Sequence, residues 1–470
     1  MADTIYDVAI IGSGPAGYTA AIRAGQLGLS TALIEKDPYL GGTCLHVGCI
    51  PTKSLLFNAE VYDHVKDGDA LGIENLTPKL NWGTIMKRKQ GIVDKHAKGL
   101  QFLMKKNKVT VIEGYGKLTG PAQGGIHTVE VEGKSGKSTI KAKNVILSTG
   151  SVARMLPGLK ADDRILTNIE VLSLNDIPKS LIVIGSGAVG VEFASIYKSF
   201  GADVTVLEML PRYVPVEDEE ISKELARVYR KRGINGFVNA KVETVERTKT
   251  GVAVTFTVDG KQQKIEADKV LIAVGRAPRT ENVGIEKTKV EVERGFVKTD
   301  EYMRTAEPGI YAIGDIAAGY PQLAHSGAME GIVAVTHIAG KPVKPINKLR
   351  IPNATYCHPE IGSVGLTEAK AKELGYDVKV GKFPFTANSR ASIVGSHDGF
   401  VKIVTDKKYG EILGVHIIGP NATELIAESV VALELECTAE HLANIIHAHP
   451  TLSEAMLDAS NAVFGMPINA

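Results

Sequence analysis

The stretches DVAIIGSGPAG, residues 7–17, and SLIVIGSGAVG, residues 180–190, decide the fold of this chain. Each is an apolar run that leads into G-x-G-x-x-G, then into a helical pattern and a second apolar run that ends in an acid, Glu35 or Glu208. In both copies the acid stands 23 positions after the first glycine, at positions 12 and 35 and at positions 185 and 208. The glycines are Gly12, Gly14, Gly17, Gly185, Gly187 and Gly190. The chain therefore contains the same strand–turn–helix–strand unit twice.

Each part of this unit has a physical task in binding a dinucleotide. The first glycine permits the tight turn, the second lets a pyrophosphate approach the backbone, and the third lets helix and strand pack closely. The helix N-terminus presents unpaired N–H groups and a partial positive charge to the phosphates, and the acid hydrogen-bonds a ribose hydroxyl. One such motif alone is often only a turn, but two copies with matched spacing predict two dinucleotide sites. We therefore expect an α/β fold with two Rossmann-like domains.

The rest of the chain adds shorter strand patterns and then a change of pattern. The runs VILSTGS (145–151), VLIAVGR (270–276) and GIYAIGD (309–315) are each expected to form a strand that ends at a glycine turn. The segment 119–140 alternates polar and β-branched residues, which predicts a small antiparallel meander. Beyond about residue 347, strands such as VKIVTD are followed by helical stretches, which predicts a C-terminal α+β domain.

Composition limits the class of protein. The chain has 470 residues, enough for about three domains, with 44% hydrophobic and 23% charged residues and a net charge of +1. No basic patch indicates a nucleic acid partner, and the apolar runs are too short to span a membrane. Because the first residues run almost directly into a strand pattern, we expect no signal or transit peptide and a cytoplasmic location.

Half of the four cysteines lie in GGTCLHVGCIPTK, residues 41–53. Structural disulfides are rare in the cytoplasm, so this pair is expected to be redox-active or to bind a metal. On an ideal helix, residues five apart are separated by about 7.5 Å in rise, whereas a disulfide allows a Cα separation of roughly 6.8 Å. A bridge between Cys44 and Cys49 therefore needs the irregular turn that Gly48 permits. Pro51 suits the first turn of a helix, which places Cys49 just ahead of a helix N-terminus, where a thiolate is stabilised.

Two alternatives stay open for this cysteine pair. Cys44, His46 and Cys49 would supply three zinc ligands, but C-x₄-C is not the usual spacing, and Cys357 and Cys437 are isolated. The pair would otherwise be two unreactive thiols. Beside two dinucleotide sites, a redox-active disulfide explains the arrangement better, so we expect redox chemistry and no metal.

Taken together, the two repeats, GGTCLHVGCIPTK and GIYAIGD resemble the pyridine nucleotide–disulfide oxidoreductases over essentially the whole chain. Within that family, HAHPTLSEA (447–455) and FPFTANSRA (383–391) are most similar to the branch that oxidises dihydrolipoamide. His46 departs from the family, which usually has asparagine at this position. The resemblance implies an FAD-binding domain at 1–150, an NAD-binding domain at 151–279, a central domain at 280–346 that completes the FAD site, and a C-terminal dimerisation domain at 347–470.

The resemblance also implies which residues carry the chemistry. A disulfide between Cys44 and Cys49 would take electrons from a dithiol substrate and pass them to FAD and then to NAD⁺. Lys53 resembles the lysine that pairs with a glutamate after the second repeat, here Glu192. Besides the six motif glycines, Glu35 and Glu208, the implied cofactor contacts are Lys53, Gly116, Thr149, Gly150, Ser151, Glu192, Val242, Gly275, Arg276, Asp315, Gln322, Leu323, Ala324 and His325.

A dithiol must lose a proton before it attacks a disulfide, which suits a histidine that titrates near neutral pH. The resemblance assigns that role to His449, oriented by Glu454 and serving the disulfide of the partner subunit in a homodimer. The residue pattern alone favours another interpretation, because Thr451-x-x-Glu454 is a capping box that would open the last long helix. His447 is a nearby competitor for which the sequence shows no matching partner.

The expected function is that of a homodimeric flavoprotein that oxidises dihydrolipoamide with NAD⁺ as acceptor. The substrate would be held on a lipoyl-bearing carrier of a 2-oxoacid dehydrogenase or glycine cleavage complex. Glu208 would repel a 2′-phosphate and only Arg212 follows closely, which favours NAD over NADP. The alternatives are a related disulfide reductase of the glutathione or mercuric type and a non-catalytic flavoprotein scaffold. The C-terminus GMPINA lacks the cysteine pair of mercuric reductases, and the presence of Cys44, Cys49 and His449 argues against a scaffold.

Overall fold

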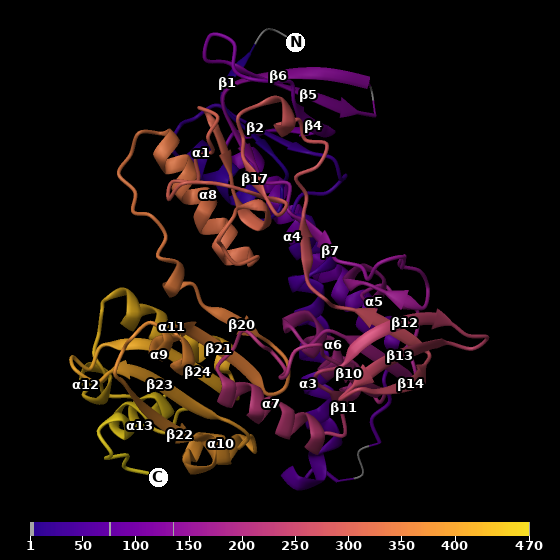
Figure 1. Cartoon of the computed structure of the whole chain (residues 1–470), viewed down its shortest axis with the longest axis vertical. Coiled ribbons are helices and arrows are strands. Elements are labelled where there is room, and N and C mark those ends of the chain that lie inside the picture. Colours follow the sequence, from indigo (N-terminus) through magenta and orange to yellow (C-terminus); the bar gives the residue numbers. More distant parts are fainter. Residues whose placement is uncertain (1–3, 75–76, 135, 470) are drawn as a thin grey trace. The chain divides into compact units, whose positions relative to one another are not determined.

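The computed structural model describes residues 4–74, 77–134 and 136–469, and it divides the chain into two compact units. Within those described ranges, the first unit consists of residues 1–54, 83–154 and 276–346, and the second of residues 55–82, 155–275 and 347–470 (Figure 1). The first glycine motif lies in the first unit and the second motif in the second unit. Segment 276–346 thus folds together with the N-terminal repeat from which it is distant in sequence.

The first unit is built on a mixed sheet with the strand order β3-β2-β1-β6-β5-β4, and β19 pairs with β6 beside this path. Its strands are β1 (Ile5–Ile11), β2 (Thr31–Glu35), β3 (Thr110–Glu113), β4 (Tyr115–Leu118), β5 (His127–Gly133), β6 (Gly136–Leu147) and β19 (Ile310–Ala312). Strands β3, β2, β1, β6 and β19 are paired in parallel, as expected for a Rossmann-like unit. Strands β4, β5 and β6 are paired antiparallel and form the predicted meander.

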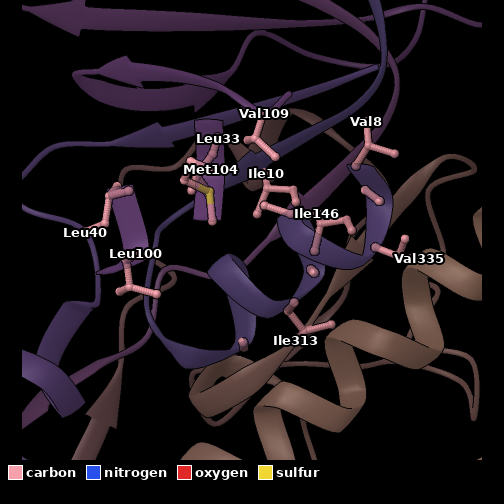
Figure 2. Close-up of a cluster of buried hydrophobic side chains, with 14 of the residues drawn as sticks. Val8, Ile10, Leu33, Leu40, Leu100, Met104, Val109, Ile146, Ile313 and Val335 are labelled. Carbon is pink, nitrogen blue, oxygen red and sulfur yellow. The ribbon is translucent and has the colours of Figure 1, made fainter. Parts of the chain in front are cut away.

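Helices α1 (Pro15–Gln26) and α8 (Ala324–Ile338) lie side by side in this unit (Figure 1). They approach closely because small residues face each other: a Cβ added at Gly331 would lie 2.7 Å from the carbonyl oxygen of Ala16. The adjoining core gathers Val8, Ile10, Leu33, Ile146, Ile313 and Val335 (Figure 2). The third segment of the unit therefore completes the core of the N-terminal repeat.

Shorter elements of the first unit surround this core. They are α2 (Gly42–Val47), the start of α3 (Cys49–Lys66), most of α4 (Trp82–Lys106), β7 (Ser151–Ala153), β16 (Arg276–Pro278), η2 (Ile285–Lys287), β17 (Val292–Glu293), β18 (Phe296–Val297) and η3 (Gly314–Ile316). Strands β7 and β16 pair antiparallel, so that Arg276 stands opposite Ala153. This two-stranded ribbon places β16, which follows the second repeat in the sequence, beside β7, which follows Gly150.

The half of the second unit that contains the second glycine motif repeats the parallel design, with the strand order β11-β10-β9-β15-β8. These strands are β8 (Ile165–Leu166), β9 (Ser180–Ile184), β10 (Asp203–Leu207), β11 (Asn235–Phe237) and β15 (Lys269–Ile272). An antiparallel sheet of β12 (Lys241–Arg247), β13 (Val252–Val258) and β14 (Lys261–Ala267) shares its core. The helices are α5 (Asn168–Val171), α6 (Ala188–Ser199) and α7 (Glu219–Lys231).

The C-terminal half of the second unit has a five-stranded antiparallel sheet in the order β20-β21-β24-β23-β22, as the α+β pattern predicts. The strands are β20 (Asn353–Thr355), β21 (Glu360–Gly365), β22 (Val378–Pro384), β23 (Phe400–Asp406) and β24 (Ile412–Gly419). The helices are α9 (Glu368–Glu373), α10 (Ser389–Val394), α11 (Ala422–Glu434), α12 (Ala439–Ala443) and α13 (Glu454–Val463). Short 3₁₀ turns are η1 (Gly68–Leu71), η4 (Lys348–Arg350) and η5 (Phe385–Ala387). Every residue of β23 and β24 is buried, so these two strands form the centre of the domain.

Candidate active site

The two glycine motifs build matching turns. Gly12 has φ +103° and Gly185 has φ +101°, which is a backbone conformation that side chains other than glycine rarely adopt. A Cβ at Gly17 would lie 1.9 Å from the Gly12 carbonyl oxygen, and a Cβ at Gly190 would lie 1.9 Å from that of Gly185. Glycine is therefore required at these four positions for a helix to pack this closely on its strand.

The middle glycine of each motif leaves room for a ligand. Gly14 is the N-cap of α1 and Gly187 the N-cap of α6, and neither helix start has a side-chain cap. No atom of the described chain lies within 4 Å of a Cβ built at either position. Each helix start thus offers free N–H groups to an open space, which fits a pyrophosphate.

The acid of each repeat is held by the serine of its own glycine motif. Glu35 Oε2 accepts hydrogen bonds from Ser13 N at 2.9 Å and Oγ at 2.6 Å, and Glu208 Oε2 accepts them from Ser186 N at 2.7 Å and Oγ at 2.8 Å. In both acids Oε1 accepts a backbone N–H two residues onward, at 2.9 Å. Sequence reasoning missed the two serines, although the tripeptide GSG in both motifs was the signal that pointed to them. Both carboxylates are therefore fixed before any ribose is bound.

Cys44 and Cys49 lie on either side of the helix break that the sequence predicts. Cys44 is in α2, Cys49 is the first residue of α3 rather than just ahead of it, and Gly48 separates the two helices. A Cβ at Gly48 would lie 2.8 Å from the carbonyl oxygen of Thr43, so the turn needs glycine. Both cysteines are thiols, as are the two isolated ones. The interrupted helix brings the two sulfur atoms together.

The two thiols do not share the proton evenly. A hydrogen bond to Cys49 raises the pKa of Cys44 well above its ordinary value, burial and the charge of Cys49 add to this, and the charge of Lys53 opposes it. Cys44 therefore keeps its proton and donates a hydrogen bond to Cys49, the first residue of α3. The neighbouring Tyr18 of α1 has its pKa raised by burial and then by the charges of both cysteines.

Arg276 links the cysteine pair to the predicted flavin contacts. Burial lowers the pKa of Arg276, whereas the charges of Asp315 and Cys49 raise it. Its Nε donates to Ser151 Oγ at 2.6 Å, and its Nη2 donates to the Ser151 carbonyl oxygen at 2.9 Å. Ser151 Oγ in turn donates to the Asp315 carboxylate, which lies 3.7 Å from Arg276 Nε. The structure thus joins residues from three distant parts of the sequence into one polar network.

The remaining predicted flavin contacts lie in the same unit. Gln322 Nε2 donates to the Asp315 carbonyl oxygen at 3.1 Å. Thr149 and Gly150 form the turn between β6 and β7, Gly116 lies in β4, Leu323 is the N-cap of α8, and Ala324 and His325 follow it. Sequence reasoning missed Glu330, a fully buried carboxylate in α8 that accepts hydrogen bonds from Gly314 N at 2.7 Å and Ser326 Oγ at 2.8 Å. This carboxylate fixes the turn that presents Asp315.

The predicted acceptor contacts lie in the second unit. Glu192 is buried in α6 and accepts a hydrogen bond from Tyr356 N at 2.9 Å. Val242 lies in β12, and Gly275, with φ +103°, follows β15. Lys53 belongs to the first unit, so its pairing with Glu192 stays a prediction.

His449 and Glu454 form the predicted pair. His449 Nδ1 lies 2.9 Å from Glu454 Oε1, and Glu454 Oε2 accepts the Thr451 N–H at 2.7 Å. Although burial acts against it, the bonds from Thr451 and His449 lower the pKa of Glu454, so it stays ionised. The His449 side chain is 71% exposed. Because Glu454 binds its Nδ1, the other ring nitrogen, Nε2, is the one that can exchange a proton with a substrate.

The alternatives at this end of the chain are corrected by the structure. Helix α13 begins at Glu454 itself, so Thr451 and Glu454 do not form a capping box, and the Thr451 hydroxyl donates to the Ala448 carbonyl oxygen. His447 does have a carboxylate partner, because its Nε2 lies 2.9 Å from Glu428 Oε1 of α11. No local pattern points to this partner, which is 19 positions away. The His447 side chain is only 5% exposed, which leaves His449 as the accessible histidine.

Neither a metal centre nor a membrane span is found in the described part of the chain. No group of three or more His, Cys, Asp or Glu side chains there is arranged to hold a metal ion. Among the helices of that same part, none combines the length and apolar character that a membrane crossing requires.

Two family models match this chain. Pyridine nucleotide-disulphide oxidoreductase matches residues 6–331, and the dimerisation domain of the same family matches residues 351–460. The chain belongs to the pyridine nucleotide-disulphide oxidoreductase family. This membership confirms the expected fold class, the assignment as an oxidoreductase and the expected cofactors FAD and NAD, and the dimerisation domain supports a homodimer.

Individual relatives in this family cover the whole chain. Dihydrolipoyl dehydrogenase of Bacillus subtilis is 45% identical over 476 aligned residues and that of Rhizobium etli 47% identical over 485, each with 99% of both chains covered. LpdA from Mycobacterium tuberculosis superposes with a TM-score of 0.89 at 30% identity, covering 97% of this chain and 98% of that one. RclA of Escherichia coli, an HOCl-induced flavoprotein disulfide reductase, gives a TM-score of 0.86 at 26% identity, covering 97% of this chain and 99% of its own.

Proposed function

We propose that this chain oxidises dihydrolipoamide to lipoamide with NAD⁺ as acceptor, as a homodimeric dihydrolipoyl dehydrogenase. The observation that carries the proposal is the thiol pair at the helix break, in which Cys44 lies in α2, Cys49 begins α3 and the two side chains are hydrogen-bonded. Such a pair can accept two electrons from a dithiol and keep its two sulfur atoms in different roles. The names of the relatives that match along the full chain support the same activity.

The first step is the removal of a proton from the substrate. His449 Nε2 accepts it from one thiol of dihydrolipoamide, because Nδ1 is held by Glu454 and the resulting imidazolium is stabilised by that carboxylate. The substrate thiolate then attacks Cys44 Sγ of the oxidised enzyme. The Cys44–Cys49 bond breaks, and Cys49 leaves as a thiolate.

The second step closes the substrate's own disulfide. Its remaining thiol, once deprotonated, attacks the substrate sulfur that is bound to Cys44 and releases Cys44 as a thiolate that takes up a proton. Lipoamide leaves, and the enzyme holds the thiol of Cys44 and the thiolate of Cys49. The Cys44 pKa, raised by its bond to Cys49, accounts for that distribution.

Two nucleotides complete the reaction, and this chain's residues fit both. When bound, FAD accepts the electron pair from the dithiol and NAD⁺ then accepts it as a hydride. Gly14 and Glu35 would hold the pyrophosphate and ribose of one, Gly187 and Glu208 those of the other. The network of Arg276, Ser151 and Asp315 would orient the flavin beside the cysteines, because Arg276 interacts electrostatically with Cys49.

The preference for NAD over NADP is also part of the proposal. Glu208 is buried and fixed by three hydrogen bonds, so a 2′-phosphate would meet a carboxylate that is unable to turn away. Arg212, the nearby cation, donates from Nη2 to the Pro215 carbonyl oxygen at 3.0 Å and is engaged by its own loop.

The location and the partner follow from the substrate. Dihydrolipoamide is carried on a lipoyl-bearing protein of a 2-oxoacid dehydrogenase or glycine cleavage complex, which is the proposed partner, and the proposed location is the cytoplasm. The proposed dimer brings His449 of one subunit to Cys44 of the other. A related disulfide reductase, of the glutathione or mercuric type, is the second candidate, since the chain also resembles the solved flavoprotein disulfide reductase RclA.

A parallel assay tests the function. The purified holoenzyme is given NAD⁺ with dihydrolipoamide, and separately glutathione disulfide with NADPH. We expect NADH to form rapidly in the first mixture and NADPH consumption to stay at background in the second. Fast NADPH-driven reduction of glutathione disulfide, with no NAD⁺ reduction by dihydrolipoamide, would replace this function with the second candidate.

A further inference from the structure

The segment between Glu208 and helix α7, residues 209–218, is here called the acceptor loop. It follows the ribose-binding acid directly, and it contains Val214, which is 2% exposed and has φ +39°. A β-branched residue avoids positive φ for steric reasons, so this conformation persists only where the surroundings impose it. The loop is therefore held in place by other groups.

One end of the loop is held by the glycine turn of its own repeat. Val214 N donates to the Ser186 carbonyl oxygen at 3.1 Å, and Ser186 is the residue whose N–H and hydroxyl bind Glu208. Glu217 N then donates to the Val214 carbonyl oxygen at 2.9 Å. If Val214 moves, Ser186 moves with it, and Ser186 in turn holds the carboxylate of Glu208.

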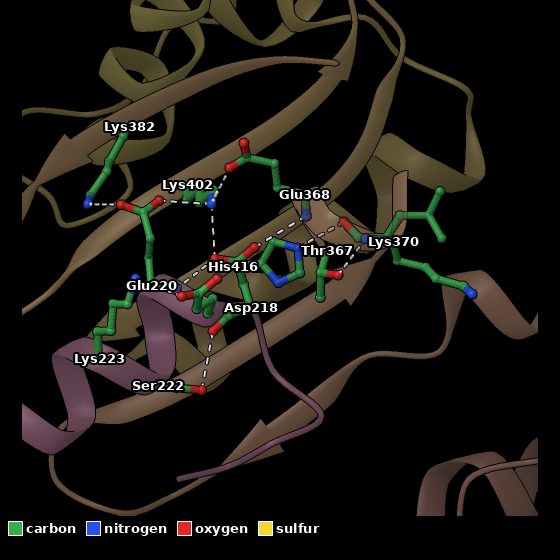
Figure 3. Close-up of polar contacts among 12 residues, drawn as sticks. Asp218, Glu220, Ser222, Lys223, Thr367, Glu368, Lys370, Lys382, Lys402 and His416 are labelled. Atoms are coloured by element: carbon green, nitrogen blue, oxygen red, sulfur yellow. Dashed lines mark hydrogen bonds and ion pairs between the residues drawn. The ribbon is translucent and has the colours of Figure 1, made fainter. Parts of the chain in front are cut away.

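The other end is held by the C-terminal domain. Lys402, in the middle of β23, is 1% exposed, and its ammonium group lies among three carboxylates (Figure 3). Nζ lies 2.9 Å from Asp218 Oδ1, 2.8 Å from Glu220 Oε2 and 2.7 Å from Glu368 Oε2. Asp218 is the last residue of the acceptor loop and also the N-cap of α7, where it accepts the Glu220 N–H at 3.0 Å.

Lys402 is the centre of this buried ion cluster. Although burial acts to lower it, the pKa of Lys402 is raised by the hydrogen bonds that it donates to Glu220, Glu368 and Asp218, so the lysine stays charged. Glu217 and His416 each interact with Asp218 of the cluster, and each has one buried polar atom with no hydrogen-bond partner within the described chain. A buried ammonium group is stable only while carboxylates surround it. Lys402 therefore holds its three carboxylate partners in fixed positions.

We infer that Lys402 is a positioning residue for NAD: from the dimerisation domain it anchors Asp218, and through the acceptor loop it holds Glu208 in place for the adenine-side ribose. The inference rests on NAD binding at the second repeat and not on the identity of the dithiol. The acceptor site then depends on a side chain 194 positions after Glu208 in the sequence, counted from 208 to 402. Lys402 itself touches no reacting atom.

Two variants of the cluster test the inference, with one matched control. Lys402→Met removes the ammonium, and Asp218→Asn removes its charge partner while keeping a good N-cap for α7. The control is Lys382→Met, since Lys382 Nζ also pairs with Glu220, at 2.7 Å, but its side chain is 41% exposed and lies over Phe400. The control thus removes a lysine from the same carboxylate without touching the acceptor loop.

The measurements separate positioning from simple loss of structure. We expect the Kd of the non-reducible probe ADP-ribose, measured by calorimetry, to rise about tenfold in Lys402→Met and Asp218→Asn, in the range of typical couplings between sites. The KM for NAD⁺ should rise equally, while kcat at saturating NAD⁺, flavin content and flavin bleaching by dihydrolipoamide stay within twofold. Lys382→Met should resemble the unaltered enzyme in all of these.

Two results would overturn the inference. One is an unchanged ADP-ribose Kd in Asp218→Asn, which decides the matter even if Lys402→Met fails to fold. The other is a loss of flavin content in step with the loss of ADP-ribose affinity, which indicates general unfolding. Because ADP-ribose binding needs no dithiol, an enzyme that rejects dihydrolipoamide would refute the proposed function and leave this test intact.

Discussion

The two dinucleotide repeats have almost the same local structure but lead to different chemistry. Their first glycines differ by 2° in φ, at +103° and +101°, and both acids are held by a serine backbone and hydroxyl. In both, the serine carbonyl oxygen accepts an N–H from the loop after the acid, from Gly41 at 3.0 Å in one and from Val214 at 3.1 Å in the other. The two repeats are thus alike up to and including this contact, and they differ in the segment after the acid.

The difference begins at that loop contact. In the first repeat the Gly41 N–H also approaches the Ser13 hydroxyl at 3.2 Å, and the chain continues into the helix that carries Cys44. In the second repeat the chain continues into the buried cluster around Lys402. One loop therefore leads to the cysteine pair and the other to the ion cluster around Lys402, so in this chain the two repeats diverge in the loop that follows the acid.

The largest expected effect concerns the first loop. Cys44→Ser and Cys49→Ser should each reduce dihydrolipoamide-dependent NAD⁺ reduction below detection, because no disulfide remains to accept the substrate's electrons. NADH oxidation by ferricyanide should continue, since it needs both nucleotide sites but no thiol. Cys437→Ser, which removes a cysteine of the other unit, is the control and should keep full activity. Measurable dithiol oxidation in Cys44→Ser would show that the loop does not carry the chemistry.

The next effect compares two histidine–carboxylate pairs. His449→Gln should lower kcat for dithiol oxidation by about 10²–10⁴-fold, the usual range for loss of a general base. His447→Gln removes the buried histidine that pairs with Glu428, so it should lower thermal stability while kcat stays within a few-fold. Steady-state kinetics of both variants and their melting curves provide the check. Equal losses of kcat in the two variants would contradict the assignment of His449 as the base and of His447 as a structural residue.

A smaller effect compares the two serines directly. Ser186→Ala should raise the KM for NAD⁺ by roughly tenfold, because a hydrogen bond to a charged carboxylate is worth about 1.5–3 kcal/mol. Ser13→Ala should instead reduce the flavin retained after gel filtration and change the rate at which iodoacetamide alkylates the thiols, since its hydroxyl also accepts the Gly41 N–H. Each variant is the control for the other. If both changed only the KM for NAD⁺, the assignment of the two sites would be wrong.

The last effect is on stability as a function of pH and leaves catalysis aside. Burial raises the pKa of Glu217 from its ordinary 4.5 to about 7, although Ser363 acts to lower it. Between those values the folded state holds a proton that the unfolded state has lost, so stability falls as pH rises from about 4.5 to 7 and is level above that. The loss amounts to about 3 kcal/mol. Glu217→Gln should flatten the dependence of the melting temperature on pH over this window, and a slope equal to that of the unaltered enzyme would contradict the assignment.

Much of the fold and part of the site could be predicted because their signals are local. The glycine motifs, the acids at matched spacing and the break at Gly48 each need only a short window of sequence. The anchor could not be predicted, since Lys402 stands in VKIVTD as an ordinary strand residue and its partner Asp218 is 184 positions away. The capping box at Thr451 was a valid local pattern, but helix α13 begins only at Glu454, whose carboxylate bonds the Thr451 N–H and also His449 Nδ1.

The pairing of β19 with β6 has a consequence for synthesis on the ribosome. The strand end at Val145–Leu147 receives this partner only when Ile310–Ala312 has been made, and α1 receives α8 later still. At about 5–20 residues per second, the N-terminal unit waits on the order of tens of seconds for its last segment. The core of the second repeat lies in the continuous stretch 155–275 and emerges complete before that. The first repeat is thus expected to finish folding after the second, and the edge of β6 at Val145–Leu147 stays unpaired in the interval.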